Sequence, residues 1–473
     1  MNKENIMKHF VAIGGGTAVV LLINLITVPL ITRLVDPSEY GIQSVFTMYG
    51  SLAASLFFMG QDQSLLRFFY LKENEEYKRT LLYRCIKYPL FLCITLNLLI
   101  LLISLMNIVK IDYGLWGAAG LCVYITILVM DRFASLLLRV SYKTKQFSIV
   151  NITSRLSYLI ISIGLIFTIN GHNSVILILA TMISAALSVT LNILVQKESW
   201  NFSKSHNDID CPSTIEIFKY GVPFIIANSV GALFSFTDKM VIHMYRTYEE
   251  VGIYSSALGM VSVFSIIQTT FCTLWSPLTL EHYERDPEDT SFYIKGHNII
   301  TVIVFAAGLT MILGKDIFVV FLGEKYREAS CLLPFLLFNP IMWTVSETTV
   351  SGLYFAKKAN MQILPPLMAC IVNFIGNIIL VPRLGCQGAA ISTGISYIIF
   401  FTIRTILGCR YYYIGFNLKI YYLITLMTVL YAFYNTFIKF NVFTVIGYLI
   451  CILCLILFYK QTIKEVLKMI GRR

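Results

Sequence analysis

Long apolar segments recur along the whole chain and are separated by short polar connections. A helix that crosses a membrane needs about 20 consecutive, mostly apolar residues. The pattern predicts such segments at residues 9–32, 42–66, 85–106, 115–138, 148–169, 174–196, 216–244, 251–279, 293–314, 330–355, 361–381, 387–408, 417–437 and 440–460. We therefore predict an all-α polytopic membrane protein with about 14 transmembrane helices.

The composition supports this assignment. Of the 473 residues, 57% are hydrophobic and 13% are charged, whereas soluble domains carry about 25% charged residues. The net charge of +11 comes mainly from basic residues in short loops. The sequence has no basic stripe with interleaved aromatic residues, so we do not expect a nucleic-acid partner.

The distribution of positive charge predicts the orientation. With the N-terminus inside the cell, 26 Lys and Arg residues fall on the cytoplasmic side and 8 on the opposite side. Cytoplasmic loops normally carry this excess, so we expect both termini in the cytoplasm. The apolar run from Phe10 to Ile31 is too long for the core of a signal peptide and is expected to remain as the first span.

Two similar halves are expected. The longest polar stretch, residues 196–213, follows the sixth span, and the pattern EYGI at 39–42 returns as EVGI at 250–253, an offset of 211. With an even number of spans in each half, this predicts a parallel pseudo-repeat, which is a transporter architecture. The expected domains are a six-helix bundle (1–196), a cytoplasmic linker (197–215), a second six-helix bundle (216–410) and a terminal helix pair with a basic tail (411–473).

Motifs of enzymatic chemistry are missing from the sequence. There is no GxxxxGK[ST], GxSxG or HExxH, and the six histidines are scattered. Residues 14–16 form a triple glycine inside the first span, which we interpret as a site of close helix packing. We expect no catalytic residue, cofactor or metal site, and a transporter rather than an enzyme.

Ionisable residues inside the predicted spans are the candidate functional residues. Each costs about 3 kcal/mol or more at mid-bilayer, so each needs a partner or an aqueous cavity. The candidates for binding an anionic substrate are the cations Arg132, Arg155, Lys239 and Arg67. The candidates for ion coupling or gating are the acids Asp131, Asp238, Glu347 and Asp62. The alternative is internal salt bridging that only fixes helix packing.

Four motifs resemble one known family. Residues 29–41 resemble PxxTRxLxPxxYG, Asp238 and Lys239 with residues 251–257 resemble D[RK]…xGxYxxA, residues 321–326 resemble xLGxxY, and residues 381–393 resemble xPxxGxxGAAxxT. Together they resemble the bacterial polysaccharide-biosynthesis membrane proteins, which are oligosaccharide repeat-unit flippases. The matching stretches cover most of the chain from about residue 10 to residue 400.

The resemblance implies the fold of the multidrug/oligosaccharidyl-lipid/polysaccharide exporter superfamily, with two six-helix bundles around a cavity. It implies a cargo of a short glycan on undecaprenyl pyrophosphate, moved across the bacterial cytoplasmic (inner) membrane by alternating access with ion coupling. The product would enter O-antigen (lipopolysaccharide) or capsule synthesis. Expected partners are the lipid-linked glycan, membrane lipid, a polysaccharide polymerase and a chain-length regulator.

Three alternatives stay open at this stage. A drug/cation antiporter or a peptidoglycan-precursor flippase would keep the fold and change the cargo. An integral-membrane polysaccharide polymerase would need a long extracytoplasmic loop, whereas the outside loops expected here are short.

Overall fold

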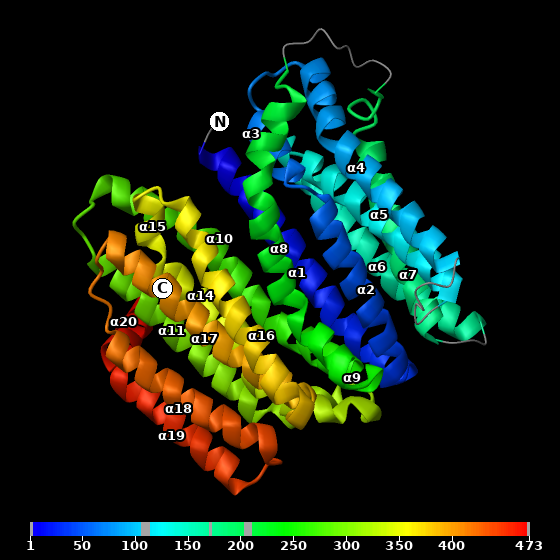
Figure 1. Cartoon of the computed structure of the whole chain (residues 1–473). Coiled ribbons are helices and arrows are strands. Elements are labelled where there is room, and N and C mark those ends of the chain that lie inside the picture. Colours follow the sequence, from blue (N-terminus) through cyan, green and yellow to red (C-terminus); the bar gives the residue numbers. More distant parts are fainter. Residues whose placement is uncertain (1–2, 106–113, 170–172, 203–210, 471–473) are drawn as a thin grey trace. The chain divides into compact units, whose positions relative to one another are not determined.

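The computed structural model describes residues 3–105, 114–169, 173–202 and 211–470, and this part of the chain is helical with no strand. The helices up to the polar linker are α1 (Lys3–Leu34), α2 (Pro37–Phe57), α3 (Gln61–Phe68), α4 (Glu75–Leu105), α5 (Gly114–Val140), α6 (Thr144–Thr168) and α7 (Asn173–Val195). Figure 1 shows their course along the chain.

A larger number of helices, several of them short, follows the linker. They are α8 (Thr214–Tyr245), α9 (Tyr248–Val261), η2 (Ser262–Phe264), α10 (Ser265–Arg285), α11 (Ser291–Leu313), α12 (Lys315–Val320), η3 (Glu324–Cys331), α13 (Leu333–Leu336), α14 (Phe338–Thr349), α15 (Ser351–Phe355), η4 (Ala359–Ile363), α16 (Leu364–Leu384), α17 (Cys386–Tyr411), α18 (Leu418–Phe437), α19 (Val442–Phe458) and α20 (Lys460–Ile470).

Among the described residues, 11 helices are long and apolar enough to cross a membrane, or up to 13 if each of two bent pairs is one span. This confirms the polytopic all-α class. The last predicted span corresponds to α19, an apolar helix of 17 residues that is shorter than the others. The count of fourteen therefore stays a prediction.

The first bent pair shows why the second predicted span is broken. Helices α2 and α3 meet at 54°, and two of the three residues between them, Met59 and Gly60, have positive φ angles of 50° and 66°. A Cβ atom on Gly60 would overlap the carbonyl oxygen of Gly221. Only glycine fits both the backbone conformation and the close approach, and the bend turns the start of α3 toward the protein interior.

The chain divides into two compact units, and the divisions fall inside α1, α2 and α8. Unit 1 consists of residues 1–23 and 42–236, and unit 2 consists of residues 24–41 and 237–473. The linker predicted at residues 197–215 separates two spans along the sequence, which is a different division from these units. Its limits therefore remain a prediction.

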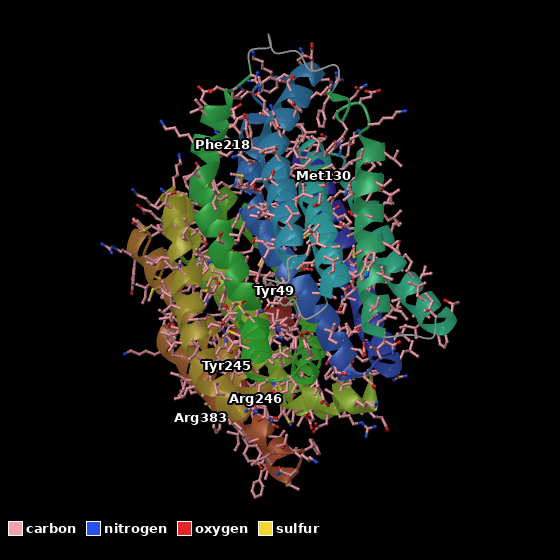
Figure 2. The ribbon with its side chains drawn as sticks, turned by 45° about the vertical axis from the view of Figure 1, so that its right-hand side comes forward. Tyr49, Met130, Phe218, Tyr245, Arg246 and Arg383 are labelled. Carbon is pink, nitrogen blue, oxygen red and sulfur yellow. The ribbon has the colours of Figure 1, made fainter. Side chains whose placement is uncertain are left out.

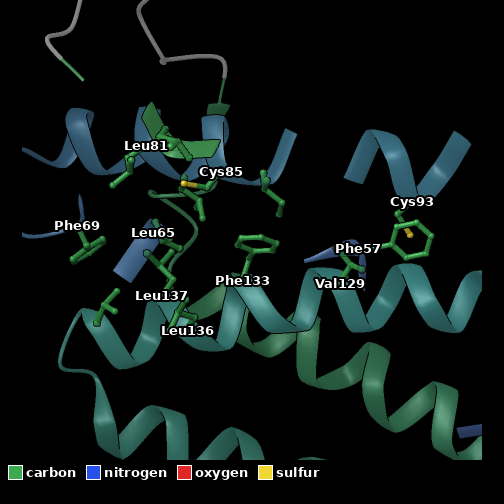
Figure 3. Close-up of a cluster of buried hydrophobic side chains, with 14 of the residues drawn as sticks. Phe57, Leu65, Phe69, Leu81, Cys85, Cys93, Val129, Phe133, Leu136 and Leu137 are labelled. Carbon is green, nitrogen blue, oxygen red and sulfur yellow. The ribbon is translucent and has the colours of Figure 1, made fainter. Parts of the chain in front are cut away.

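Unit 1 contains a large apolar core between α3, α4 and α5 (Figure 3). Leu65, Leu81 and Phe133 are fully buried in it, and Ile217 from the start of α8 belongs to the same cluster. Ser64 Oγ donates a hydrogen bond to the Ile217 carbonyl at 2.8 Å. These contacts explain why the first part of α8 belongs to unit 1.

In unit 2, two of the family-like motifs meet at a pair of glycines. A Cβ on Gly41 would overlap the carbonyl oxygen of Tyr248, and a Cβ on Gly252 would overlap that of Pro37. The two contacts are reciprocal, because Tyr248 and Gly252 lie 211 positions after Pro37 and Gly41, respectively. This reciprocity supports the parallel repeat inferred from the sequence.

The other motif turns of unit 2 pack by similar contacts to backbone groups. Arg246, at the end of α8, donates to the carbonyls of Val381 (3.1 Å) and Pro382 (2.9 Å), next to Arg383 (Figure 2). Tyr326 of the motif at 321–326 donates to the Val35 carbonyl at 3.0 Å. These hydrogen bonds to backbone carbonyls hold the motif turns against one another and so stabilise the packing of this end of unit 2.

Candidate functional site

In unit 1, Asp62 on α3 and Arg132 on α5 form an ion pair. Asp62 Oδ2 accepts hydrogen bonds from Arg132 Nη2 at 2.6 Å and Nε at 3.1 Å. The Asp62 side chain is fully buried, whereas that of Arg132 is 37% exposed and its guanidinium lies 5.5 Å from the centre of the Phe58 ring. The structure thus joins one predicted substrate-binding cation to one predicted coupling acid.

Asp131 contacts a different helix from the one that Arg132 contacts. Its Oδ1 accepts hydrogen bonds from Ser188 Oγ at 2.8 Å and Asn192 Nδ2 at 3.2 Å, both on α7. Adjacent residues of a helix point about 100° apart. Asp131 and Arg132 are therefore expected to contact different neighbours, as they do here. Asp131 therefore ties α5 to α7 through neutral donors.

Arg155 is exposed on α6 and lines a pocket of unit 1. The pocket has a volume of about 190 Å³, and its other polar lining comes from Ser148 and Asn151 on α6 and from Thr17 on α1. Arg67 is exposed at the end of α3, away from this lining. Of the four predicted cations, Arg155 is the one that lines this pocket.

In unit 2, Asp238 on α8 lies at the centre of a buried cluster of neutral donors. Its Oδ2 accepts from Tyr254 Oη at 2.6 Å and Thr393 Oγ1 at 2.7 Å. Its Oδ1 accepts from Asn373 Nδ2 at 2.9 Å and Asn377 Nδ2 at 2.8 Å. Four hydrogen bonds thus stabilise the carboxylate without a basic side chain among their donors.

The two asparagines of this cluster each have a free oxygen. Both side chains are fully buried, and neither Asn373 Oδ1 nor Asn377 Oδ1 has a hydrogen-bond partner within the described structure. A 180° rotation of an amide group exchanges its oxygen and nitrogen at almost no change in shape. The same residues can therefore present either N–H donors or oxygen ligands to the Asp238 position.

Sequence reasoning found Asp238 and missed its amide partners. Asn373 and Asn377 lie four residues apart on α16, in an otherwise apolar segment, and this spacing was an available signal. Lys239, the next residue on α8, is half-buried, and its charge interacts with that of Asp238. The structure brings these two predicted residues into one region.

Glu347 on α14 is paired with Arg404 on α17, two helices that pack together in unit 2 (Figure 1). Arg404 Nη2 lies 2.8 Å from Glu347 Oε1, and their side chains are 8% and 9% exposed, respectively. Arg404 Nη1 also donates to Ser346 Oγ at 2.7 Å, and the guanidinium lies 5.7 Å from the Trp343 ring centre and 5.5 Å from that of Phe400. Sequence reasoning assigned Arg404 to the cytoplasmic charge and missed this pair.

Among the described residues, no three His, Cys, Asp or Glu side chains gather into a metal-binding group. The four candidate acids instead fall into two kinds. Asp62 and Glu347 each contact an arginine, whereas the hydrogen bonds of Asp131 and Asp238 come from neutral side chains. The second kind can take up and release a cation without breaking an internal ion pair.

The chain is similar to known membrane proteins along most of its length. The family described as "Polysaccharide biosynthesis protein" matches residues 6–279, more than half of the chain. A protein of Haloferax volcanii described as the probable low-salt glycan biosynthesis flippase Agl15 is 20% identical over 330 residues, which cover 67% of each chain.

Solved structures show the same fold. The lipid II flippase MurJ in an inward closed conformation superposes with a TM-score of 0.71 at 16% identity, covering 96% of this chain and 99% of that one. An inward-facing multidrug resistance MATE family transporter of the MOP superfamily gives 0.57 at 14% identity, covering 84% and 93%. The chain therefore belongs to the polysaccharide biosynthesis protein family, and it has the fold of these flippase and transporter structures.

Proposed function

We propose that this chain is a flippase that moves oligosaccharide repeat units linked to undecaprenyl pyrophosphate across the bacterial cytoplasmic membrane by alternating access. The family description and the name of the Haloferax relative support a glycan-linked cargo. The product would supply O-antigen or capsule synthesis, with both termini in the cytoplasm and with a polymerase and chain-length regulator acting downstream.

The observation that carries the coupling mechanism is the Asp238 cluster. The hydrogen bonds to this carboxylate come from neutral side chains, and in a medium of low dielectric a carboxylate attracts a cation more strongly than it does in water. Protonation would supply that cation directly. Alternatively, rotation of the Asn373 and Asn377 amides would turn their free oxygens toward Asp238, and hard cations such as Na⁺ prefer oxygen ligands.

Binding at this cluster can be linked to the transport cycle. Tyr254 is on α9, Asn373 on α16 and Thr393 on α17, so a cation at Asp238 would alter contacts among four helices of unit 2. A ligand shifts a conformational equilibrium only by its differential affinity for the two states. We propose that the cation gradient acts on the flippase in this way.

The other cargoes make different predictions about the same chain. A peptidoglycan-precursor flippase would be required for growth, and a drug/cation antiporter would change drug resistance on deletion. A polymerase would change the length of the surface glycan while leaving its repeat units exported.

A complementation experiment tests the proposed cargo. A strain that lacks this gene is expected to lose its surface polysaccharide and to accumulate the lipid-linked repeat unit inside, and the intact gene should restore both. Asp238→Asn should fail to restore export, whereas Asp286→Asn, at an exposed loop residue outside the cluster, should succeed. Normal surface polysaccharide in the deletion strain would contradict the proposal.

A further inference from the structure

Two connecting segments of unit 2 expose large apolar side chains, although a connection that lies in water normally carries polar ones. One segment is α12 with the residue after it, and the other is the turn between α18 and α19 with the start of α19. Six apolar side chains of these segments are each more than half exposed, and we call them the apolar rim: Ile317, Val320, Phe321, Phe440, Val442 and Phe443.

A buried lysine joins the two segments. Lys315, the first residue of α12, is 1% exposed, and its Nζ donates to the carbonyls of Asn435 at 2.6 Å and Ile438 at 3.2 Å. These carbonyls belong to the last turn and the C-cap of α18, where a helix leaves its acceptors without partners. The helix dipole also favours a cation at this end. The end of α18 thus obtains from the protein the hydrogen bonds that water supplies to an exposed helix end.

The turn between α18 and α19 is likewise closed by protein side chains. Asn441 Oδ1 accepts from the Thr444 amide at 3.0 Å, and Thr444 Oγ1 accepts from the Asn441 amide at 3.3 Å, which makes a capping box. Tyr431 Oη donates to the Thr444 carbonyl at 3.2 Å. A backbone in contact with lipid must satisfy its polar groups internally, because hydrocarbon offers no hydrogen bonds. The turn therefore combines an apolar exterior with polar groups that are bonded inside the protein.

The length of α19 places this turn in the bilayer. Its 17 residues rise about 26 Å, whereas the hydrocarbon core of a membrane is about 30 Å thick. Lys460 follows the helix after a single residue, Tyr459, and its charge favours the polar boundary. Measured from that boundary, α19 ends about 4 Å before the far edge of the core. The exposed Lys439 of the turn can extend its ammonium group from there to the lipid headgroups.

Charged side chains begin three residues after Phe321. Glu324, Lys325 and Arg327 of η3 are each more than half exposed, and Lys325 is paired with Asp36. The chain therefore passes from exposed apolar to exposed charged side chains within one short segment. Such a change is expected where a protein surface passes from hydrocarbon to the headgroups and water.

We propose that the apolar rim is a lipid-contact surface embedded at the edge of the hydrocarbon core, and that Lys315 holds its two segments together. The partner is bilayer lipid, because the rim continues the exposed apolar surface of α18 and α19, which pack together (Figure 1) and on which Leu430 and Leu449 are also more than half exposed. The rim fixes the depth of this helix pair in the membrane. This inference goes beyond the proposed function, since it concerns neither the cargo nor the coupling cation.

The experiment measures the depth of the rim in the full-length chain, reconstituted into vesicles of phosphatidylcholine and phosphatidylglycerol. Phe321→Trp, Phe443→Trp and the control Glu324→Trp each add one tryptophan, and the fluorescence of the four native tryptophans is subtracted with wild-type protein. Lipids with brominated acyl chains should quench the tryptophans at 321 and 443 several-fold more than the one at 324. Iodide in the water should quench in the opposite order.

Lys315→Met tests the role of the lysine in the background of Phe443→Trp. The carbonyls at the end of α18 then lack their donor and should draw in water, so iodide quenching should rise several-fold, while Lys315→Arg should keep it low. Unchanged quenching in Lys315→Met would overturn the role of Lys315.

Two results would overturn the lipid contact itself. Iodide quenching at 321 and 443 as strong as at 324 would show that the rim lies in water. Protection of both positions from iodide and from brominated lipid would show that another protein surface covers the rim. Because quenching is measured without transport, either result would leave the proposed function standing.

Discussion

The ion pair between Glu347 and Arg404 gives a prediction whose magnitude follows from burial. Both side chains are less than one-tenth exposed, so removing either one leaves the other charge buried without its partner. Such single truncations destabilise proteins by about 3–5 kcal/mol. We expect Arg404→Met and Glu347→Leu each to reduce stability by about this amount, with Arg404→Met near the upper end because Arg404 also donates to Ser346.

The double variant distinguishes a packing pair from a coupling acid. Replacing a buried ion pair by apolar side chains of similar volume is often neutral or stabilising. We therefore expect the double variant Glu347→Leu with Arg404→Met to unfold close to the wild-type temperature, apart from loss of the Ser346 hydrogen bond. The assay is thermal unfolding of the purified protein in detergent, combined with export of surface polysaccharide by the same four proteins.

Two results would refute this reasoning. If the two destabilisations simply added in the double variant, the charges would not be coupled in the way that their 2.8 Å contact indicates. If the double variant were stable and failed to export, Glu347 would take part in coupling or gating rather than only in packing. Stable, active double-variant protein is the outcome we expect.

Two further predictions concern unit 1. Gly60→Ala should destabilise the protein by about 1–3 kcal/mol more than the control Gly114→Ala. Both glycines have positive φ angles, but of the two only Gly60 has a Cβ position that overlaps a carbonyl oxygen. Equal unfolding temperatures of the two variants would contradict the close contact with Gly221. Arg132→Gln should reduce stability by about 2 kcal/mol, because it removes a charged hydrogen-bond partner from the fully buried Asp62. Introducing Asp62→Asn into that variant should recover part of the loss, and a further decrease in unfolding temperature would show that the two residues are not paired.

The helices were predictable because the membrane imposes long apolar segments on the sequence. Each predicted span coincides with one helix or with a series of short helices. The bends were harder to predict, because the break at Gly60 depends on contact with Gly221, which is distant in the sequence. The assignment of residues 24–41 to unit 2 likewise depends on such contacts, including that of Gly41 with Tyr248.

The candidate site was predictable only where a charge made it visible. The cost of burying Asp238 identified the residue, but its neutral partners Asn373 and Asn377 contribute no charge to the pattern. Arg404 lies near the predicted end of the twelfth span, where a basic residue fits the positive-inside pattern, so its buried position was not apparent. Partners such as Asp62 and Arg132 are 70 residues apart, and a single sequence carries no direct signal of their contact.

The most direct test of the account measures translocation of the lipid-linked oligosaccharide by the purified chain in proteoliposomes, with and without an imposed proton or Na⁺ gradient. We predict that one of these gradients accelerates translocation by the wild-type protein and has no effect on the Asp238→Asn variant, while the Asp286→Asn control behaves as wild type. Translocation that is independent of both gradients, or that responds to a gradient equally in Asp238→Asn, would contradict coupling through the Asp238 cluster.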